Sequence, residues 1–191
     1  MSLACELAQN ISKSCEFPPV KGTNDEIYII EKNNISGITE DVNNPLLVSA
    51  ITKVATEKAF KYEFLRNSLT PSVELVRDEF GERWKQGVMA KIAGATPEVK
   101  LELLRLAGTK VVVIVKNNYG GDADGKSKYE MFGYGTGLTL TVATDTDNNK
   151  VYSIELMTED GYEDGKPPRT IFDTSETVTK AMLDSLLVAS S

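Results

Sequence analysis

The sequence predicts a mostly β protein of the α+β class, built as an antiparallel β-sandwich or barrel with one flanking helix and a C-terminal helix. Several short runs alternate apolar and polar side chains, which is the period of a half-buried strand. One further run, at 110–118, is dominated by Val and Ile and indicates a strand buried on both faces. Apolar residues recur at helical spacing after a capping residue at 96–107 and again from Ser175 onward.

The chain begins with a polar arm, 1–25, in which Pro18 and Pro19 block regular structure. The run 26–32 follows and is rich in Ile and Tyr, so we expect the first strand there. Two more strands are expected at 35–38 and 46–54. A fourth is expected at 57–67, where a strand places three aromatic residues on one face, although a helix also remains open: Phe60, Tyr62 and Phe64.

The segment 70–94 fits two descriptions. Val73 and Val76 have a helical spacing, whereas Val73 and Leu75 have the spacing of a strand. Gly81 lies in the middle of the segment, and a glycine inside a long helix is unfavourable. The segment is therefore predicted to form two long strands joined near this glycine.

A helix is predicted at 96–107. Thr96 is a suitable N-cap and Pro97 suits the first turn. Gly108 follows the last turn and is expected to leave the helix in a left-handed conformation. The apolar stripe of this helix is expected to pack on a sheet, and it comprises Val99, Leu103 and Leu106, widened by Leu104 and Ala107.

The remaining elements follow the buried run 110–118. The glycine-rich segment 120–128 is expected to be an exposed loop, and a long acidic loop is expected at 159–168. Strands are expected at 128–133, 137–144, 150–157 and 169–174, with a hairpin turn at 144–150. The chain then divides into an N-terminal arm (1–25), a β-sandwich or barrel domain (26–157) and a C-terminal segment (158–191) with the acidic loop and the last helix.

Composition narrows the range of functions. The chain has 191 residues and a net charge of −7, with no basic cluster of the kind that binds nucleic acid. It has no histidine, which removes the commonest general base and metal ligand. Cys5 and Cys15 lack the spacing of a metal site, so we expect reduced structural thiols, with one disulfide as the alternative. No segment has the length and apolarity of a membrane span, and the first residues lack the basic and apolar regions of a signal peptide, so we expect no signal peptide and synthesis in the cytoplasm.

The stretch from Tyr129 to Leu140 contains three alternating glycines, Gly133, Gly135 and Gly137. A dinucleotide fingerprint requires a third glycine where this chain has Leu138 or Leu140, and it must open a helix. Here a strand pattern follows instead. The glycines are therefore expected to allow a sharp bend or a close approach of two backbones.

Acidic pairs in the loops resemble calcium-binding loops but lack essential ligands. Asp122 and Asp124 would need an acid at Gly120 and a Glu at Met131, and the segment 145–149 lacks its final Gly and Glu. Both are expected to be turns. No nucleophile motif is present and no pair of carboxylates is selected, so we expect no catalytic, cofactor-binding or metal residues.

Trp84 lies between two basic residues, Arg83 and Lys85. An interface or core anchor is the favoured interpretation, because tryptophan is usually well buried. The alternative is a β-sandwich that binds carbohydrate through Trp84 or Tyr134, and an acid-dependent hydrolase with unidentified carboxylates is a third hypothesis.

The ordered pattern of segments resembles the tail-tube and neck-ring proteins of tailed phages, especially those of crAss-like phages and their relatives. The likeness covers most of residues 3–157 and ends there. It is carried by these segments in order: LACELAQNISKSC, EIYIIEKNNISGIT, FKYEF, TPSVELVRDEFGERWKQGVMAKI, PEVKLELLRLA, KVVVIVKNN and FGYGTGL.

The resemblance implies a β-sandwich or barrel flanked by one helix, whose subunits join their sheets into a ring. Rings of six-fold or twelve-fold order stack into a tube in the virion, beside other tail or neck proteins. DNA passes through without specific binding, to which the acidic balance of the chain is suited. Gly133, Gly135, Gly137 and Trp84 are then expected to lie at subunit contacts.

Overall fold

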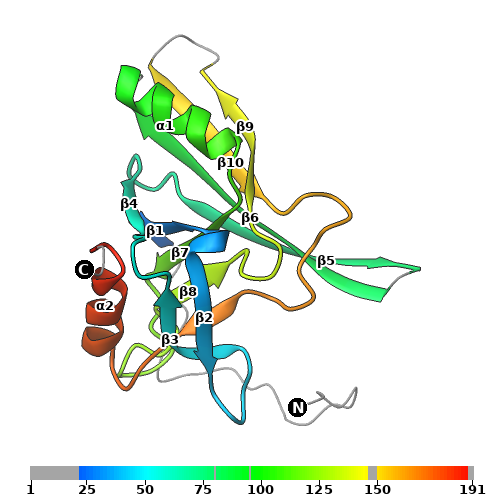
Figure 1. Cartoon of the computed structure of the whole chain (residues 1–191), viewed down its shortest axis with the longest axis vertical. Helices are drawn as coiled ribbons and strands as arrows, with labels where there is room; N and C mark the ends of the chain where they lie inside the picture. The colour runs from blue at the N-terminus through cyan, green and yellow to red at the C-terminus, as the bar shows by residue number, and fades with distance from the viewer. Residues whose placement is uncertain (1–21, 80, 95, 146–149, 189–191) are drawn as a thin grey trace.

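The computed structural model describes residues 22–79, 81–94, 96–145 and 150–188, which form two β-sheets and two α-helices (Figure 1). The α+β, mostly β class is confirmed. Cys5, Cys15 and nearly all of the predicted arm 1–25 lie outside the described residues. The elements are β1 (Thr23–Glu31), the 3₁₀ helix η1 (Lys32–Asn34), β2 (Ile35–Glu40), β3 (Leu47–Lys53), β4 (Phe60–Glu63), β5 (Thr70–Asp78), β6 (Gly81–Ala93), α1 (Pro97–Ala107), β7 (Val111–Asn117), β8 (Tyr129–Phe132), β9 (Thr139–Thr144), β10 (Val151–Met157), β11 (Arg169–Ile171) and α2 (Glu176–Ser185).

The larger sheet has seven strands in the order β2-β3-β11-β8-β7-β1-β4. Its pairs are antiparallel, except that β11 runs parallel to β3. Val111–Val115 of β7 is buried throughout, because β7 lies near the middle of the sheet with both faces covered. The predicted two-faced burial of this run is therefore confirmed.

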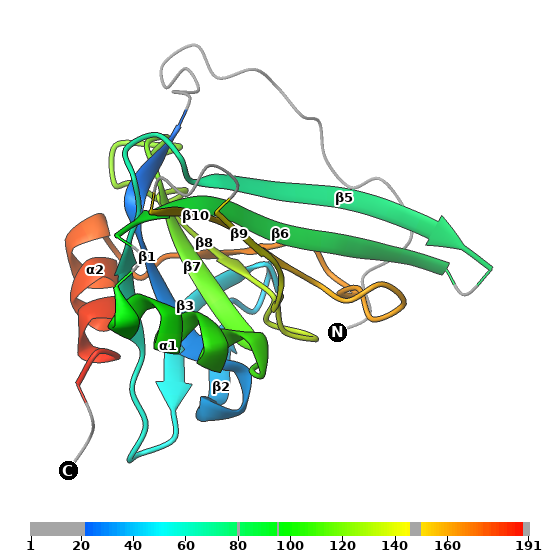
Figure 2. The same cartoon turned by 90° about the horizontal axis from the view of Figure 1, so that it is seen from above.

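The smaller sheet has four strands in the order β5-β6-β10-β9. β5 and β6 pair from Thr70↔Met89 to Asp78↔Gly81, so the two long strands predicted to meet near Gly81 are confirmed. β10 pairs only with the second half of β6, from Gly87 to Ala93. As a result, the end of the β5–β6 hairpin that carries the tip at Gly81 extends past the rest of the sheet, as Figures 1 and 2 show.

Three layers bury two apolar clusters. The smaller sheet and α1 cover one face of the larger sheet, and the cluster between them includes Ile27, Val113, Phe132, Val88, Leu156, Leu103 and Leu106. α2 covers the other face, and the second cluster includes Tyr28, Ile114, Tyr129, Met131, Ile171, Leu183 and Leu186. The predicted segment 158–191 thus supplies β11 to the larger sheet and α2 to its cover.

α1 begins and ends where its sequence predicts. The Thr96 hydroxyl accepts a hydrogen bond from the Val99 N–H at 3.4 Å, and Pro97 is the first helical residue. Two details were wrong. Gly108 leaves the helix at φ −101° rather than in the left-handed region, and its N–H is satisfied by the carbonyls of Arg105 and Leu106. Leu104 and Ala107 were expected to widen the buried stripe, but both are exposed, Leu104 to 71%.

Candidate functional site

The alternating glycines form the turn that carries the chain from one sheet to the other. β8 ends in the larger sheet at Phe132, and β9 starts in the smaller sheet at Thr139. Gly133 and Gly137 have φ of +74° and +85°, which side chains rarely adopt, and the Gly137 N–H donates to the Gly133 carbonyl at 2.9 Å. The sharp bend predicted for this stretch is present.

Gly135 packs against the chain's own buried acid. Asp164 is 2% exposed, and its Oδ1 accepts the Thr136 N–H at 2.8 Å. A Cβ added to Gly135 would strike this same oxygen. Burial raises the pKa of Asp164, although backbone N–H groups of Thr136 and Gly135 and the charge of Arg169 partly oppose the rise. The close approach made by Gly135 is therefore within the chain, and its role at a subunit contact stays a prediction.

Trp84 and Tyr134 are both engaged by their own chain. The Trp84 backbone pairs with that of Asp164 through two hydrogen bonds of 2.7 and 3.0 Å, and its side chain is half-buried. The ring of Tyr134 has the Arg169 guanidinium 4.5 Å and the Lys32 ammonium 4.9 Å from its centre. Two cationic side chains of the same chain thus lie against the Tyr134 ring, where a sugar ring would stack.

The projecting β5–β6 hairpin has a partly apolar, unpaired edge. β5 is an outermost strand of its sheet, and within the described residues no strand lies on its other side. Val73 and Leu75 are 45% and 37% exposed, and they share one face of the hairpin with Trp84. Ion pairs at the tip tie the two strands together, Arg77 to Glu82 at 3.0 Å and Arg83 to Asp78.

The acidic loop after β10 braces the same hairpin. Lys85 pairs with Asp160 at 2.6 Å, and Arg83 lies 3.6 Å from Glu163. The pKa of Glu163 is lowered, first by backbone N–H donors that include that of Gly161. These contacts hold the hairpin against the loop, so the hairpin projects as a stiffened arm.

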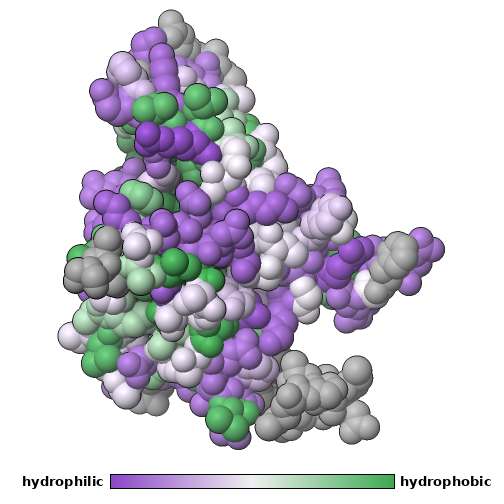
Figure 3. Space-filling view, in the orientation of Figure 1, coloured by the Kyte–Doolittle hydropathy of each residue, from purple (hydrophilic) through white to green (hydrophobic). Residues whose placement is uncertain are grey.

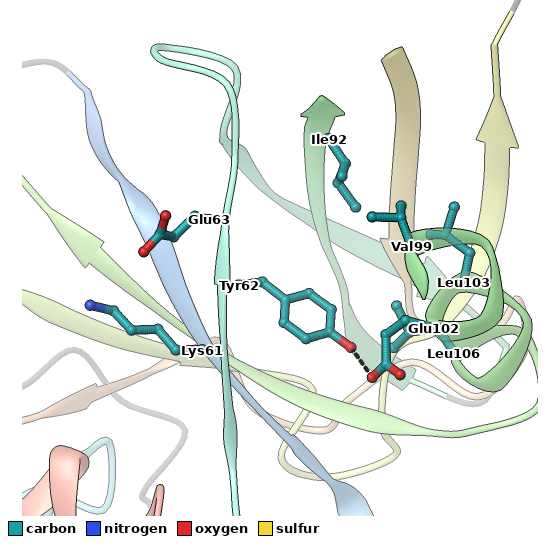
Figure 4. Close-up of a pocket in the computed structure, with 8 residues that line it drawn as sticks. All are labelled: Lys61, Tyr62, Glu63, Ile92, Val99, Glu102, Leu103 and Leu106. Carbon is teal, nitrogen blue, oxygen red and sulfur yellow. Dashed lines mark hydrogen bonds between the residues drawn. The ribbon is translucent and has the colours of Figure 1, made fainter. Parts of the chain in front are cut away.

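A groove separates β4, an outermost strand of the larger sheet, from α1. The Tyr62 hydroxyl crosses it and donates to Glu102 Oε1 at 2.6 Å (Figure 4). Burial and this hydrogen bond raise the pKa of Tyr62, so it stays a neutral donor. Figure 4 also shows Lys61 and Glu63 pointing away from the groove, to the other face of the strand.

The groove has two hollows that meet at Tyr62. One holds about 220 Å³ and the other about 270 Å³, and both are lined by Tyr62, Glu102 and Leu106. Apolar side chains supply most of the remaining wall, namely Ile92, Val99 and Leu103 in the first hollow and Ile29, Phe60 and Val111 in the second. The groove thus combines an open strand edge with apolar recesses, which is the arrangement that accepts an added strand.

These surfaces were predictable from local sequence patterns only in part. The aromatic stripe was confirmed, with Phe64 buried, Tyr62 half-buried and Phe60 45% exposed. The groove itself was missed, because Tyr62 and Glu102 are 40 residues apart and no local pattern links them. The predicted turns in the loop 120–128 are present, since Asp122 Oδ1 accepts the Lys126 N–H at 2.9 Å.

Among the described residues, no group of three or more acidic or cysteine side chains is placed to hold a metal ion. No helix in that part of the chain is both long and apolar enough to cross a membrane. Comparisons with protein-family models, curated proteins and solved structures find no match for this chain.

Proposed function

We propose that this chain is a non-enzymatic structural subunit of a phage tail or neck, and that it assembles into rings around a channel that conducts DNA. The observation that carries the proposal is the open edge of β5 on a hairpin that extends past the body, with Val73 and Leu75 exposed along it. A long, partly apolar edge of this kind is a template for pairing with another chain.

The geometry of the edges favours closed rings over pairs. The described sheets end in four different strands, β2 and β4 on the larger sheet and β5 and β9 on the smaller. Contacts between unlike edges of identical subunits are head-to-tail, and they close into a ring when the rotation between subunits divides a full turn. Six-fold or twelve-fold order is the ring size that the resemblance to tail-tube and neck-ring proteins implies.

The charge of the chain is compatible with a DNA-conducting channel. The net charge of −7 disfavours attachment to phosphates. Figure 3 shows hydrophilic residues over most of the visible surface, including the tip of the hairpin, with apolar residues gathered over α1 and the lower body. A subunit of this kind belongs in the virion, next to other tail or neck proteins.

Negative-stain electron microscopy and analytical ultracentrifugation of the concentrated protein test the proposal. We expect rings or stacked tubes with a central hole, in equilibrium with monomers at low concentration. Dispersed monomers at every concentration contradict it. Monomers that bind an insoluble polysaccharide, and lose that binding on Trp84→Ala, support the carbohydrate-binding alternative instead.

A further inference from the structure

We propose that the β5 edge of one subunit adds to β4 of a second copy of this chain, so that its exposed apolar side chains fill the groove against α1. The inference rests on the proposed self-assembly and names the two surfaces that meet. Both are open strand edges in the described structure, β5 on the smaller sheet and β4 on the larger.

The backbone N–H and C=O groups that point outward at these edges belong to Val73 and Leu75 on β5 and to Lys61 and Glu63 on β4. An antiparallel pair would set these residues opposite each other and turn Val73 and Leu75 away from the groove, so the two strands run parallel. A parallel pair satisfies main-chain donors and acceptors on both sides and keeps the apolar side chains on the groove face.

The spacing of the apolar groups matches. Val73 and Leu75 point to the same face of β5 and, at about 3.4 Å per residue, lie about 7 Å apart along the strand. Phe60 and Tyr62 have the same spacing on β4. Phe60 lines the second hollow, and Tyr62 lies where the two hollows meet. Opposite these aromatic residues, one of the two apolar side chains reaches the second hollow and the other reaches the point where the hollows meet.

Charge selects the register. The side chain between the two apolar residues is Glu74, which would lie on the opposite face, where β4 presents Lys61 and Glu63. One register sets Glu74 against Lys61, and a shift by two residues sets it against Glu63. The second register places like charges opposite each other and is disfavoured. The first register places Glu74 beside the Lys61 ammonium, which pairs with Glu26 of its own chain at 2.5 Å.

The register is tested by crosslinking within the assembled protein. The variant carries Glu74→Cys and Lys61→Cys together with Cys5→Ser and Cys15→Ser. Neighbouring strands lie about 4.8 Å apart, so directly opposite residues are within reach of a short thiol-specific bridging reagent. We expect a ladder of covalent oligomers that is absent from each single-cysteine variant. The matched control pairs Lys61→Cys with Glu82→Cys, an exposed site on β6 of the same hairpin.

Rings without the covalent ladder overturn this inference and leave the proposed function standing. Absence of rings overturns both. A second measurement does not depend on crosslinking, because Val73→Glu places a charge in an apolar hollow. It should raise the concentration for half-assembly by about tenfold or more, about 1.4 kcal/mol of contact free energy. The control Val42→Glu, at a site 76% exposed in another loop, should leave it unchanged. An equal effect of both variants contradicts the contact.

Discussion

At the scale of single residues, the turn between the two sheets packs tightly against one buried carboxylate. Asp164 binds the Thr136 N–H and lies against Gly135, while its own backbone pairs with Trp84 on the hairpin. Three segments distant in sequence therefore share one contact. Side-chain volume at this point is constrained, because close-packed interiors accommodate added atoms only by distortion.

Replacement Gly135→Val should lower the free energy of unfolding by about 1–3 kcal/mol, because the new Cβ displaces the Asp164 carboxylate. Urea denaturation measures this loss. The matched control is Gly37→Val in β2, where an added Cβ meets nothing within 4 Å and the change should stay within about 0.5 kcal/mol. Equal stabilities for the two variants would show that the turn rearranges freely.

The same carboxylate gives a pH dependence with a definite sign. Because burial raises the folded pKa of Asp164 above its value in the unfolded chain, its contribution is full at low pH and is lost as pH rises through the folded pKa. Asp164→Asn keeps an oxygen that accepts the Thr136 N–H but cannot ionise. From about pH 4 to pH 7, the wild type should therefore lose stability relative to this variant. Urea midpoints that run parallel across this range contradict the assignment.

At the scale of elements, α2 is held to the larger sheet by an apolar stripe and by polar contacts, one of which is the ion pair of Glu176 with Lys116 of β7 at 3.0 Å. Leu183 is fully buried, and Asp184 accepts the Tyr28 hydroxyl at 2.7 Å. Burial works against ionisation of Asp184, but hydrogen bonds from Lys180 and Tyr28 outweigh it and lower the pKa. The apolar side chains buried with Leu183, among them Leu186, supply more of the docking free energy than one hydrogen bond does.

Leu183→Ala should cost about 2–5 kcal/mol in unfolding free energy, since it leaves a cavity between α2 and the sheet. Val178→Ala on the same helix is the control. Its side chain is 42% exposed, so the change should stay within about 0.5 kcal/mol. Thermal unfolding followed by circular dichroism compares the two, and a Leu183→Ala loss as small as the control's rules out α2 as a structural cover.

Elements with a local signal were predictable, whereas their neighbours in space were not. Gly81 marked the hairpin tip, and Thr96 with Pro97 marked the start of α1. The strand predicted at 57–67 is only Phe60–Glu63, because the edge pairs with β1 over those residues alone. β11 lies between β3 and β8 in the larger sheet. Its pairing with β3 joins residues more than a hundred positions apart in the sequence, which no periodicity encodes.

At the scale of the whole molecule, assembly must overcome the repulsion between subunits of net charge −7. One Glu74–Lys61 pair at an exposed edge contributes little against it. The apolar and main-chain parts of the contact are insensitive to moderate salt. Raising ionic strength from about 0.01 M to about 0.15 M shortens the Debye length from about 30 Å to about 8 Å and screens the repulsion.

Added salt should therefore lower the concentration for half-assembly, as measured by sedimentation velocity across a series of sodium chloride concentrations. For Val73→Glu, added salt should also lower the concentration for half-assembly. That concentration should stay above the wild-type value, because the variant removes apolar contact and adds negative charge. Assembly that weakens as salt rises contradicts this balance of forces. It would mean that ion pairs across the interface outweigh the net repulsion, and that the contact lies on a more charged surface than the edges of β4 and β5.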